Sequence, residues 1–101
     1  MKVYKVFIKE CALSEINSIS DDILSVSESI NIVENYIDGL YAEIQKLSVY
    51  GASLPFCQNE DIIAIYGKYI RRMNYKKIAV FFYVDNDNIL IQEIKFQHTI
   101  M

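Results

Sequence analysis

The sequence predicts an α+β domain of two layers, with its elements in the order β-α-α-β-β-β. Three observations carry this prediction: an alternating segment at the N-terminus, two long segments with a helical apolar repeat, and an apolar run followed by a turn and another apolar segment. The chain has 101 residues, of which 52% are hydrophobic and 23% charged, as in an ordinary globular domain. We expect one domain over residues 1–101, with a helical hairpin packed on an antiparallel-type sheet.

The N-terminal segment Lys2–Lys9 is predicted to form a half-buried strand. Apolar side chains occupy every second position from Tyr4 to Ile8, and lysines lie between and after them. Because the alternation begins at once, the segment does not resemble a secretory leader. The longest apolar run, Ile78–Val84, is also far shorter than the roughly 20 residues that span a bilayer. We expect a cytoplasmic protein with no membrane partner.

Two amphipathic helices are predicted after this strand. Apolar residues recur at steps of three and four over Ala12–Val26, and again more regularly over Ile30–Leu47. Ser27 or Ser29 can cap the start of the second helix, and Gly51 follows its end. Because the connection is short, the helices must run antiparallel as a hairpin. The short second repeat favours a seam within the chain over a coiled coil between chains.

The C-terminal half is predicted to form a three-stranded antiparallel meander. Residues 51–61, which include the only proline, are expected to be the one real loop. Lys68–Met73 follows as a strand, and Ile78–Val84 as the most buried strand, because a continuous apolar run indicates a strand covered on both faces. Asp85–Asn88 has the composition of a turn, and Ile89–Phe96 returns as the last strand.

The order and spacing of these segments resemble the RelE/ParE toxin superfamily over essentially the whole chain. The most telling stretch is Ile70–Met73 followed by Ile78–Asp85, because family members carry an arginine-bearing strand, an aromatic strand and then an acidic turn. Leu47–Pro55 is similar to the family's exit from the second helix. The resemblance implies the toxin component of a bacterial type II toxin–antitoxin system, a plasmid stabilisation protein, held by an antitoxin whose disordered C-terminal part folds around it.

Departures from the family pattern bear on the cellular target. Ribosome-dependent mRNA ribonucleases of the family offer arginine, lysine, histidine or tyrosine groups for acid–base chemistry at a ribose hydroxyl and its phosphate. This chain carries a net charge of −3, has Phe82 where a tyrosine is common, and lacks the final arginine pair after Phe96. The comparison favours a ParE-like toxin that acts through DNA gyrase. A RelE-like mRNA endoribonuclease and a degenerate, non-toxic partner-binding module are the alternatives.

If the chain were a ribonuclease, its catalytic candidates would be few. Arg72 and Lys77 are the candidates for a phosphate clamp, and Tyr75 and His98 for the acid and the base. A lone histidine near a terminus is more often an ordinary surface residue. Because cleavage requires an acid, a base and a clamp close together, we expect the chain not to be an efficient ribonuclease.

Charge is divided unevenly along the sequence. Residues 10–46 hold eight acids and one base, whereas residues 68–77 hold five bases and no acid. This pattern predicts an acidic face and a basic stripe, although two plainly solvated surfaces would give the same count. We expect the basic stripe to bind an acidic stretch of the antitoxin. Its members are Lys68, Arg71, Arg72, Lys76 and Lys77.

We expect neither a metal nor a small-molecule cofactor. The three glycines are scattered and form no phosphate-binding loop. Cys11 and Cys57 lie far apart, lack neighbours at metal-ligand spacing, and fit reduced cytosolic thiols better than a disulfide. The remaining partners to consider are the antitoxin and either gyrase or the ribosome with its mRNA.

Overall fold

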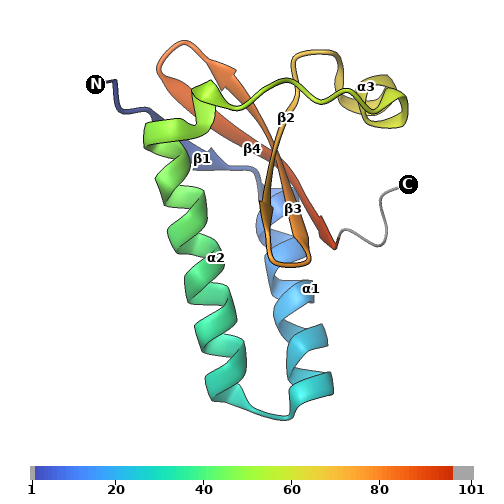
Figure 1. Cartoon of the computed structure of the whole chain (residues 1–101). Coiled ribbons are helices and arrows are strands. Elements are labelled where there is room, and N and C mark those ends of the chain that lie inside the picture. Colours follow the sequence, from blue (N-terminus) through green and yellow to red (C-terminus); the bar gives the residue numbers. More distant parts are fainter. Residues whose placement is uncertain (1, 97–101) are drawn as a thin grey trace.

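The computed structural model describes residues 2–96, which form three α-helices and a four-stranded mixed sheet (Figure 1). The α+β class and the order of the two long helices and four strands are confirmed. The elements are β1 (Lys5–Ile8), α1 (Glu10–Ser27), α2 (Ile30–Tyr50), the 3-10 turn η1 (Gly51–Ser53), α3 (Glu60–Tyr66), β2 (Arg71–Tyr75), β3 (Ile78–Asp85) and β4 (Asn88–Phe96).

The sheet has the strand order β1-β4-β3-β2. The predicted meander is confirmed, because β2, β3 and β4 pair as successive antiparallel neighbours. The first strand instead pairs parallel with β4, from Lys5 opposite Asn88 to Ile8 opposite Ile91, so the antiparallel pattern does not extend to this edge. A parallel pair needs a long crossover connection, and the helices and the other strands supply it here.

The helical hairpin is confirmed, and local contacts fix its turn. Glu28 adopts a left-handed conformation with φ of 55°, which ends α1. The Ser29 hydroxyl then accepts a hydrogen bond from the Ile32 backbone N–H at 3.4 Å, so Ser29 is the cap that starts α2. The two long helices extend well past the turn between β2 and β3 (Figure 1). None of the helices within residues 2–96 is long and apolar enough to cross a membrane.

The main core lies between the helical hairpin and one face of the sheet. Ala12, Ile16 and Leu40 are among the helix residues whose side chains are buried there. The strands contribute alternate residues to this face, including Ile78, Val80 and Phe82 of β3. Each apolar stripe predicted from the helical repeat therefore faces the core over most of its length, but Val26 at the end of the first stripe and Ile30 at the start of the second are exposed.

The prediction that residues 51–61 form one plain loop is wrong at both ends. The chain continues from α2 into the 3-10 turn η1, and α3 begins at Glu60. The Asn59 side chain caps α3 by accepting hydrogen bonds from the backbone N–H groups of Asp61 and Ile62 at 2.9 and 3.1 Å. A helix of seven residues is too short to show a clear repeat in the sequence, and it depends on packing for its stability.

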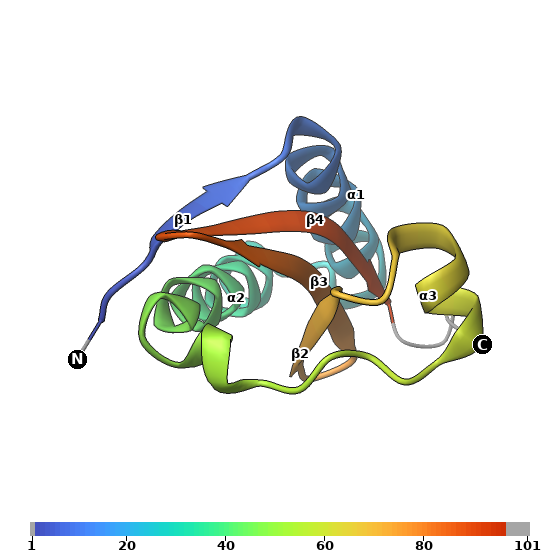
Figure 2. The same ribbon diagram turned by 90° about the horizontal axis from the view of Figure 1, so that it is seen from above.

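Helix α3 covers part of the sheet face that is opposite the helical hairpin. Seen from above, α2 and α3 lie on opposite sides of β3 (Figure 2). Ile62 packs with Ile70, Ala79 and Phe81 in a second, smaller apolar cluster. This cluster explains how β3 is buried on both faces, as the apolar run predicted.

The strand predicted at Lys68–Met73 is displaced in the structure and lies at Arg71–Tyr75. Lys68 and Tyr69 belong to a turn that follows Gly67, whose φ of 92° ends α3. Strand β2 continues two residues beyond the predicted end, to Tyr75. The turn to β3 then begins at Lys76, which has a φ of 53°. Lys68 is therefore not part of the strand.

Candidate functional site

Strand β2 carries the predicted site residues, and the pairing register assigns each to a face of the sheet. Arg71 lies opposite Phe82, and Arg72 lies opposite Phe81. Directly paired residues share a face, and Phe82 belongs to the core under the helical hairpin whereas Phe81 belongs to the cluster under α3. The side chains of Arg71 and Arg72 consequently leave β2 on opposite faces.

Arg71 holds the loop that precedes α3. Its Nε–H donates a hydrogen bond to the Leu54 carbonyl at 2.9 Å, and its guanidinium lies 4.4 Å from the centre of the Phe56 ring. A backbone bridge between Phe56 and Arg71, and a hydrogen bond from Cys57 N–H to the Ile70 carbonyl at 2.9 Å, attach the same loop to the edge of β2. Arg71 thus has a structural task that the sequence pattern does not reveal.

Two aromatic rings in contact lie between two cations at this end of β2. The Lys68 ammonium lies 5.2 Å from the Tyr69 ring centre, Tyr69 meets Phe56 edge-on at 5.5 Å, and Phe56 faces Arg71. We call these four residues the aromatic ladder. Tyr69 is 61% exposed, so the ladder offers an open apolar and positively charged surface. Phe56 was missed at the sequence level, because a single aromatic residue in a loop carries no periodic signal.

Arg72 lies on the α3 face. Its guanidinium is 5.6 Å from the Phe81 ring centre, and its Nε–H donates to the Asn74 side-chain oxygen at 2.7 Å. The side chains of Arg72 and Asn74 line a shallow groove of about 210 Å³ between β2 and α3. Cys57 and Ile62 also line this groove. Burial raises the pKa of the Cys57 thiol, and the Arg72 charge opposes that effect.

A second polar pair, Tyr66 and Glu93, also lies beside Phe81. Tyr66 stacks on Phe81 with ring centres 5.7 Å apart and donates its hydroxyl hydrogen bond to Glu93 at 3.2 Å. Desolvation by burial raises the pKa of Tyr66 to about 12, and the Glu93 carboxylate adds to the shift. The Tyr83 hydroxyl donates to the Tyr66 carbonyl. Glu93 and Tyr66 were not among the predicted site residues, because neither stands in a motif.

Tyr75 is directed to the hairpin face. Its ring meets Tyr36 of α2 edge-on at 5.6 Å, and a Cβ added at Gly39 would overlap its hydroxyl, so this side chain packs closely on α2. Lys76 extends over the same two rings, 4.9 Å from Tyr36 and 5.4 Å from Tyr75. These contacts give Tyr75 a packing role.

The three described members of the predicted catalytic set are not gathered at one point. Arg72 lies on the α3 face, Tyr75 packs on the opposite face, and Lys77 lies in the turn between β2 and β3. His98 falls outside the described residues. The basic stripe is divided in the same way, with Lys68 and Arg71 in the aromatic ladder, Arg72 on the α3 face, and Lys76 and Lys77 at the hairpin turn.

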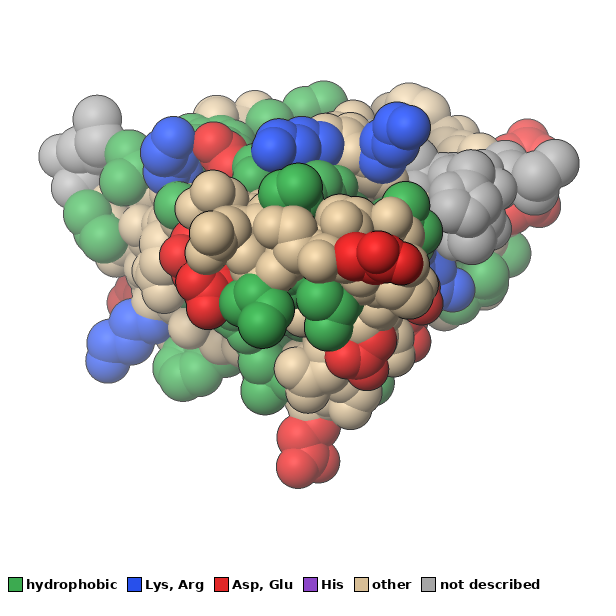
Figure 3. Space-filling view, turned by 90° about the horizontal axis from the view of Figure 1, so that it is seen from below, with side chains coloured by type: hydrophobic (Ala, Val, Ile, Leu, Met, Phe, Trp, Pro, Cys, Tyr) green, Lys and Arg blue, Asp and Glu red, His purple; other side chains and the backbone are tan. Residues whose placement is uncertain are grey.

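The predicted acidic face is most visible at the free end of the helical hairpin. A view from below shows hydrophobic side chains there among acidic ones, with lysine and arginine side chains mainly along the upper border and others at the two sides (Figure 3). Among residues 2–96, the only carboxylate of α1 or α2 with a lysine or arginine within ion-pairing distance is Glu43, which lies 3.1 Å from Lys46. This end of the molecule therefore has a negative potential.

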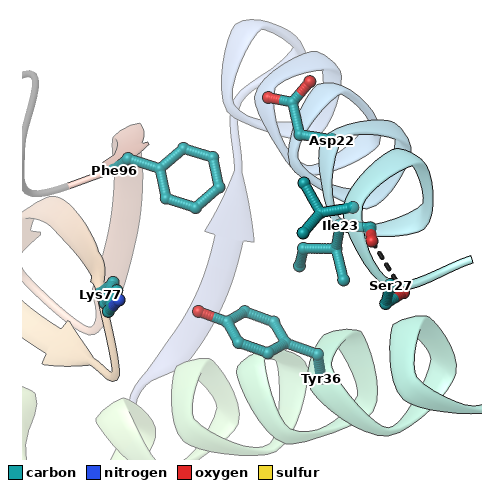
Figure 4. A pocket seen from close by; sticks show the side chains of 7 residues that line it. Asp22, Ile23, Ser27, Tyr36, Lys77 and Phe96 are labelled. Atoms are coloured by element: carbon teal, nitrogen blue, oxygen red, sulfur yellow. Dashed lines mark hydrogen bonds between the residues drawn. The ribbon is translucent and has the colours of Figure 1, made fainter.

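A groove of about 500 Å³ opens beside this end (Figure 4). Burial raises the pKa of the Tyr36 hydroxyl in its wall, and a hydrogen bond from the Lys77 backbone opposes that shift. Figure 4 shows the Tyr36 and Phe96 rings directed into the space between the helices and the end of the sheet. The groove is lined by Asp22, Ile23, Val26, Ser27, Tyr36, Lys77 and Phe96.

Within the part of the chain that the structure describes, no three histidine, cysteine, aspartate or glutamate side chains come together as a metal site. No protein-family model matches the sequence, and no curated protein matches it. A structural match exists with a chain of the solved structure described as "Chromosomal ParDE TA system from P. aeruginosa". It covers 93% of this chain and 96% of that chain with a TM-score of 0.76 at 12% sequence identity, so the two chains share one fold.

Proposed function

We propose that this chain is a ParE-like toxin of a type II toxin–antitoxin system, which inhibits growth by binding DNA gyrase and does not cleave RNA. The shared fold with a chain of a ParDE system, over nearly the full length of both, supports the toxin assignment. The observation that carries the choice of mechanism is the separation of Arg72 and Tyr75 on opposite faces of β2. Acid–base cleavage needs its groups within a few ångströms of one another, whereas protein binding needs only a complementary surface.

The test of this mechanism compares two activities of one protein. We expect the purified chain to inhibit gyrase supercoiling, while mapping of mRNA ends on translating ribosomes detects no codon-positioned cleavage. The variants Arg72→Ala and His98→Ala should leave the mRNA ends unchanged. Cleavage that either variant abolishes would instead identify a RelE-like ribonuclease, and the absence of both activities would identify a non-toxic partner-binding module.

We further propose that the basic residues around β2 receive an acidic stretch of the antitoxin. The aromatic ladder supports this role, because Lys68 and Arg71 are displayed next to the exposed rings of Tyr69 and Phe56. Arginine contacts to carboxylates are among the stronger ones, at roughly 1.5–3 kcal/mol each. Rings and cations together would bind a segment that combines acids with apolar side chains.

We expect the antitoxin to be encoded by a short open reading frame next to this gene, and the test uses the product of that frame. Reversal of Arg71 and Arg72 to glutamate should weaken the complex by orders of magnitude at low salt, because attraction becomes repulsion. Arg71 also holds the Leu54 carbonyl, so Lys68→Glu serves as a variant without that structural task, and Lys5→Glu on β1 as a matched charge control. Affinity that is indifferent to ionic strength and to Lys68→Glu would exclude this surface.

A further inference from the structure

The free half of the helical hairpin leaves apolar side chains uncovered on the side that faces the sheet. Helices α1 and α2 extend past the turn between β2 and β3, so the last turns of α1 and the first turns of α2 have no strand beneath them (Figure 1). Val26 of α1 is 87% exposed and Ile32 of α2 is 52% exposed. Ile32 precedes Tyr36 by one helical turn, which places both on the face that borders the groove of Figure 4.

These residues enlarge the groove into one apolar surface, which we call the distal groove: Ile23, Val26, Ile32, Tyr36 and Phe96. A cavity of about 500 Å³ has room for several side chains of a partner. Exposed apolar surface of this kind costs free energy in water, and covering it yields about 25 cal/mol per Å². Contiguous apolar patches with a polar rim are typical of protein interaction sites.

The charge around the distal groove selects the kind of partner. The half of the helical hairpin that lies nearest the groove, residues 21–38, holds five acids and no lysine or arginine. The walls of the groove itself carry one charge of each sign, Asp22 of α1 and Lys77 of the turn between β2 and β3, so the excess of acids comes from the surrounding helix surface. Glu28 and Glu34 lie on either side of the Ser29 cap, and no described lysine or arginine pairs with them. The unpaired carboxylates favour a positively charged partner.

We propose that the distal groove binds a basic amphipathic helix of a partner protein. The apolar ridge of that helix would enter the space between Val26, Ile32 and Phe96, as one helix packs into the grooves of others. Its lysine and arginine side chains would extend toward the acidic residues of α1 and α2. This surface is distinct from the basic residues of β2 that receive the acidic stretch of the antitoxin, and it does not depend on the toxin assignment.

Other occupants fit the charge less well. A second copy of this chain that docks by the same end would set the carboxylates of one hairpin against those of the other, which is repulsive. RNA or DNA would bring phosphates to a surface that repels them. An extended strand would need a free strand edge, whereas helix side chains form most of the walls here.

The experiment uses a fluorescent synthetic helix of about four turns, built from leucine and lysine with leucine along one face, and a matched peptide with glutamate in place of lysine. Fluorescence anisotropy with the full chain should detect the lysine peptide and give at least about tenfold weaker binding for the glutamate peptide. Val26→Lys and Ile32→Lys should each weaken the lysine peptide by about tenfold or more. Both residues are largely exposed, so these variants should melt like the unchanged protein.

Leu24→Lys is the matched control. Leu24 is 39% exposed on the same helix, and it stands two positions before Val26, so it points to the opposite side of α1. It introduces the same charge and should leave most of the binding intact. If Leu24→Lys weakened binding as much as Val26→Lys, the added positive charge alone would explain the loss, and the proposal would be overturned. A Val26→Lys variant that binds the peptide normally would also overturn it.

Three further outcomes would assign the groove to another occupant and also overturn the proposal. The first is a dimer, detected by sedimentation, that Val26→Lys dissociates. The second is binding of a single-stranded RNA that the same variant abolishes. The third is peptide binding that occurs only in a variant truncated after Phe96, because the groove would then be filled by residues 97–101 of the chain itself.

Discussion

The two faces of the sheet are built differently, although β3 supplies fully buried side chains to both. On the hairpin face, Val80 and Phe82 meet two long helices in a large apolar core. On the α3 face, Ala79 and Phe81 meet one short helix in a small cluster, and polar side chains surround it. Burial of apolar area is the main source of stability, so the hairpin face should carry most of it. The α3 face keeps charged groups close to its surface, where a partner can reach them.

The largest expected effect comes from a charge placed in the hairpin core. Leu40 of α2 is fully buried between α1 and the sheet. Leu40→Asp removes a large apolar group and buries an unpaired carboxylate, which should cost at least about 5 kcal/mol, comparable with the whole stability of a small domain. Circular dichroism during heating should find no cooperative transition. A soluble Leu40→Asp variant that melts cooperatively would show that the hairpin face is not the main core.

A matched pair of phenylalanines allows the stability contributed by each face to be compared directly. Phe82 on the hairpin face and Phe81 on the α3 face are neighbours in sequence, and both are fully buried. Replacement of a buried phenylalanine by alanine costs about 3–5 kcal/mol. We expect Phe82→Ala at the upper end of that range, because two helices enclose it, and Phe81→Ala at the lower end, because α3 can relax. Urea unfolding measures both, and a larger cost for Phe81→Ala would reverse the comparison.

The close contact between Tyr75 and Gly39 predicts a smaller effect on stability. The sign of this effect should depend on whether Tyr75 is present. Alanine in a helix is favoured over glycine by about 1 kcal/mol. In the unchanged protein, Gly39→Ala should nevertheless destabilise by about 1 kcal/mol or more, because its Cβ overlaps the Tyr75 hydroxyl. In a Tyr75→Ala background, the same substitution should stabilise by up to about 1 kcal/mol. Equal effects in both backgrounds, from urea unfolding, would mean that Tyr75 does not pack on α2.

The smallest expected effect is a pH dependence on the α3 face. Tyr66 has its pKa raised from 10.0 to about 12 by burial and by Glu93. Below pH 10 the phenol is neutral in both the folded and the unfolded chain, so its contribution to stability is complete. Between pH 10 and 12 the unfolded chain loses this proton before the folded chain does, so the free energy of unfolding should fall.

Thermal unfolding at several pH values measures this decline. Tyr66→Phe should reduce the slope without removing it, because the pKa values of Tyr36, Tyr50 and Tyr83 are also raised by burial. An unchanged slope in Tyr66→Phe would show that the hydroxyl contact with Glu93 does not resist ionisation. Tyr36→Phe on the hairpin face provides the matched variant for the comparison of faces.

Local patterns in the sequence determined the two long helices, the buried strand and the turn between the last two strands. The repeat over Ile30–Leu47 and the alternation near Tyr4 depend on the spacing of neighbours alone, so each could be recognised without knowledge of the rest of the chain. The cap at Ser29 follows from the same local chemistry. Short elements such as α3 were missed because two helical turns hold too little of the repeat.

Tertiary structure alone decided which charged and polar groups share a surface. A strand that contains Arg71 and Arg72 already places them on opposite sides, but only the pairing of β2 with β3 shows that Arg71 lies on the hairpin face and Arg72 on the α3 face. The parallel pairing of β1 with β4 likewise depends on contacts between distant segments. The distal groove exists because the helical hairpin is longer than the sheet that it covers. The spacing of residues within each helix does not reveal that difference in length, since it appears only when the two layers pack together.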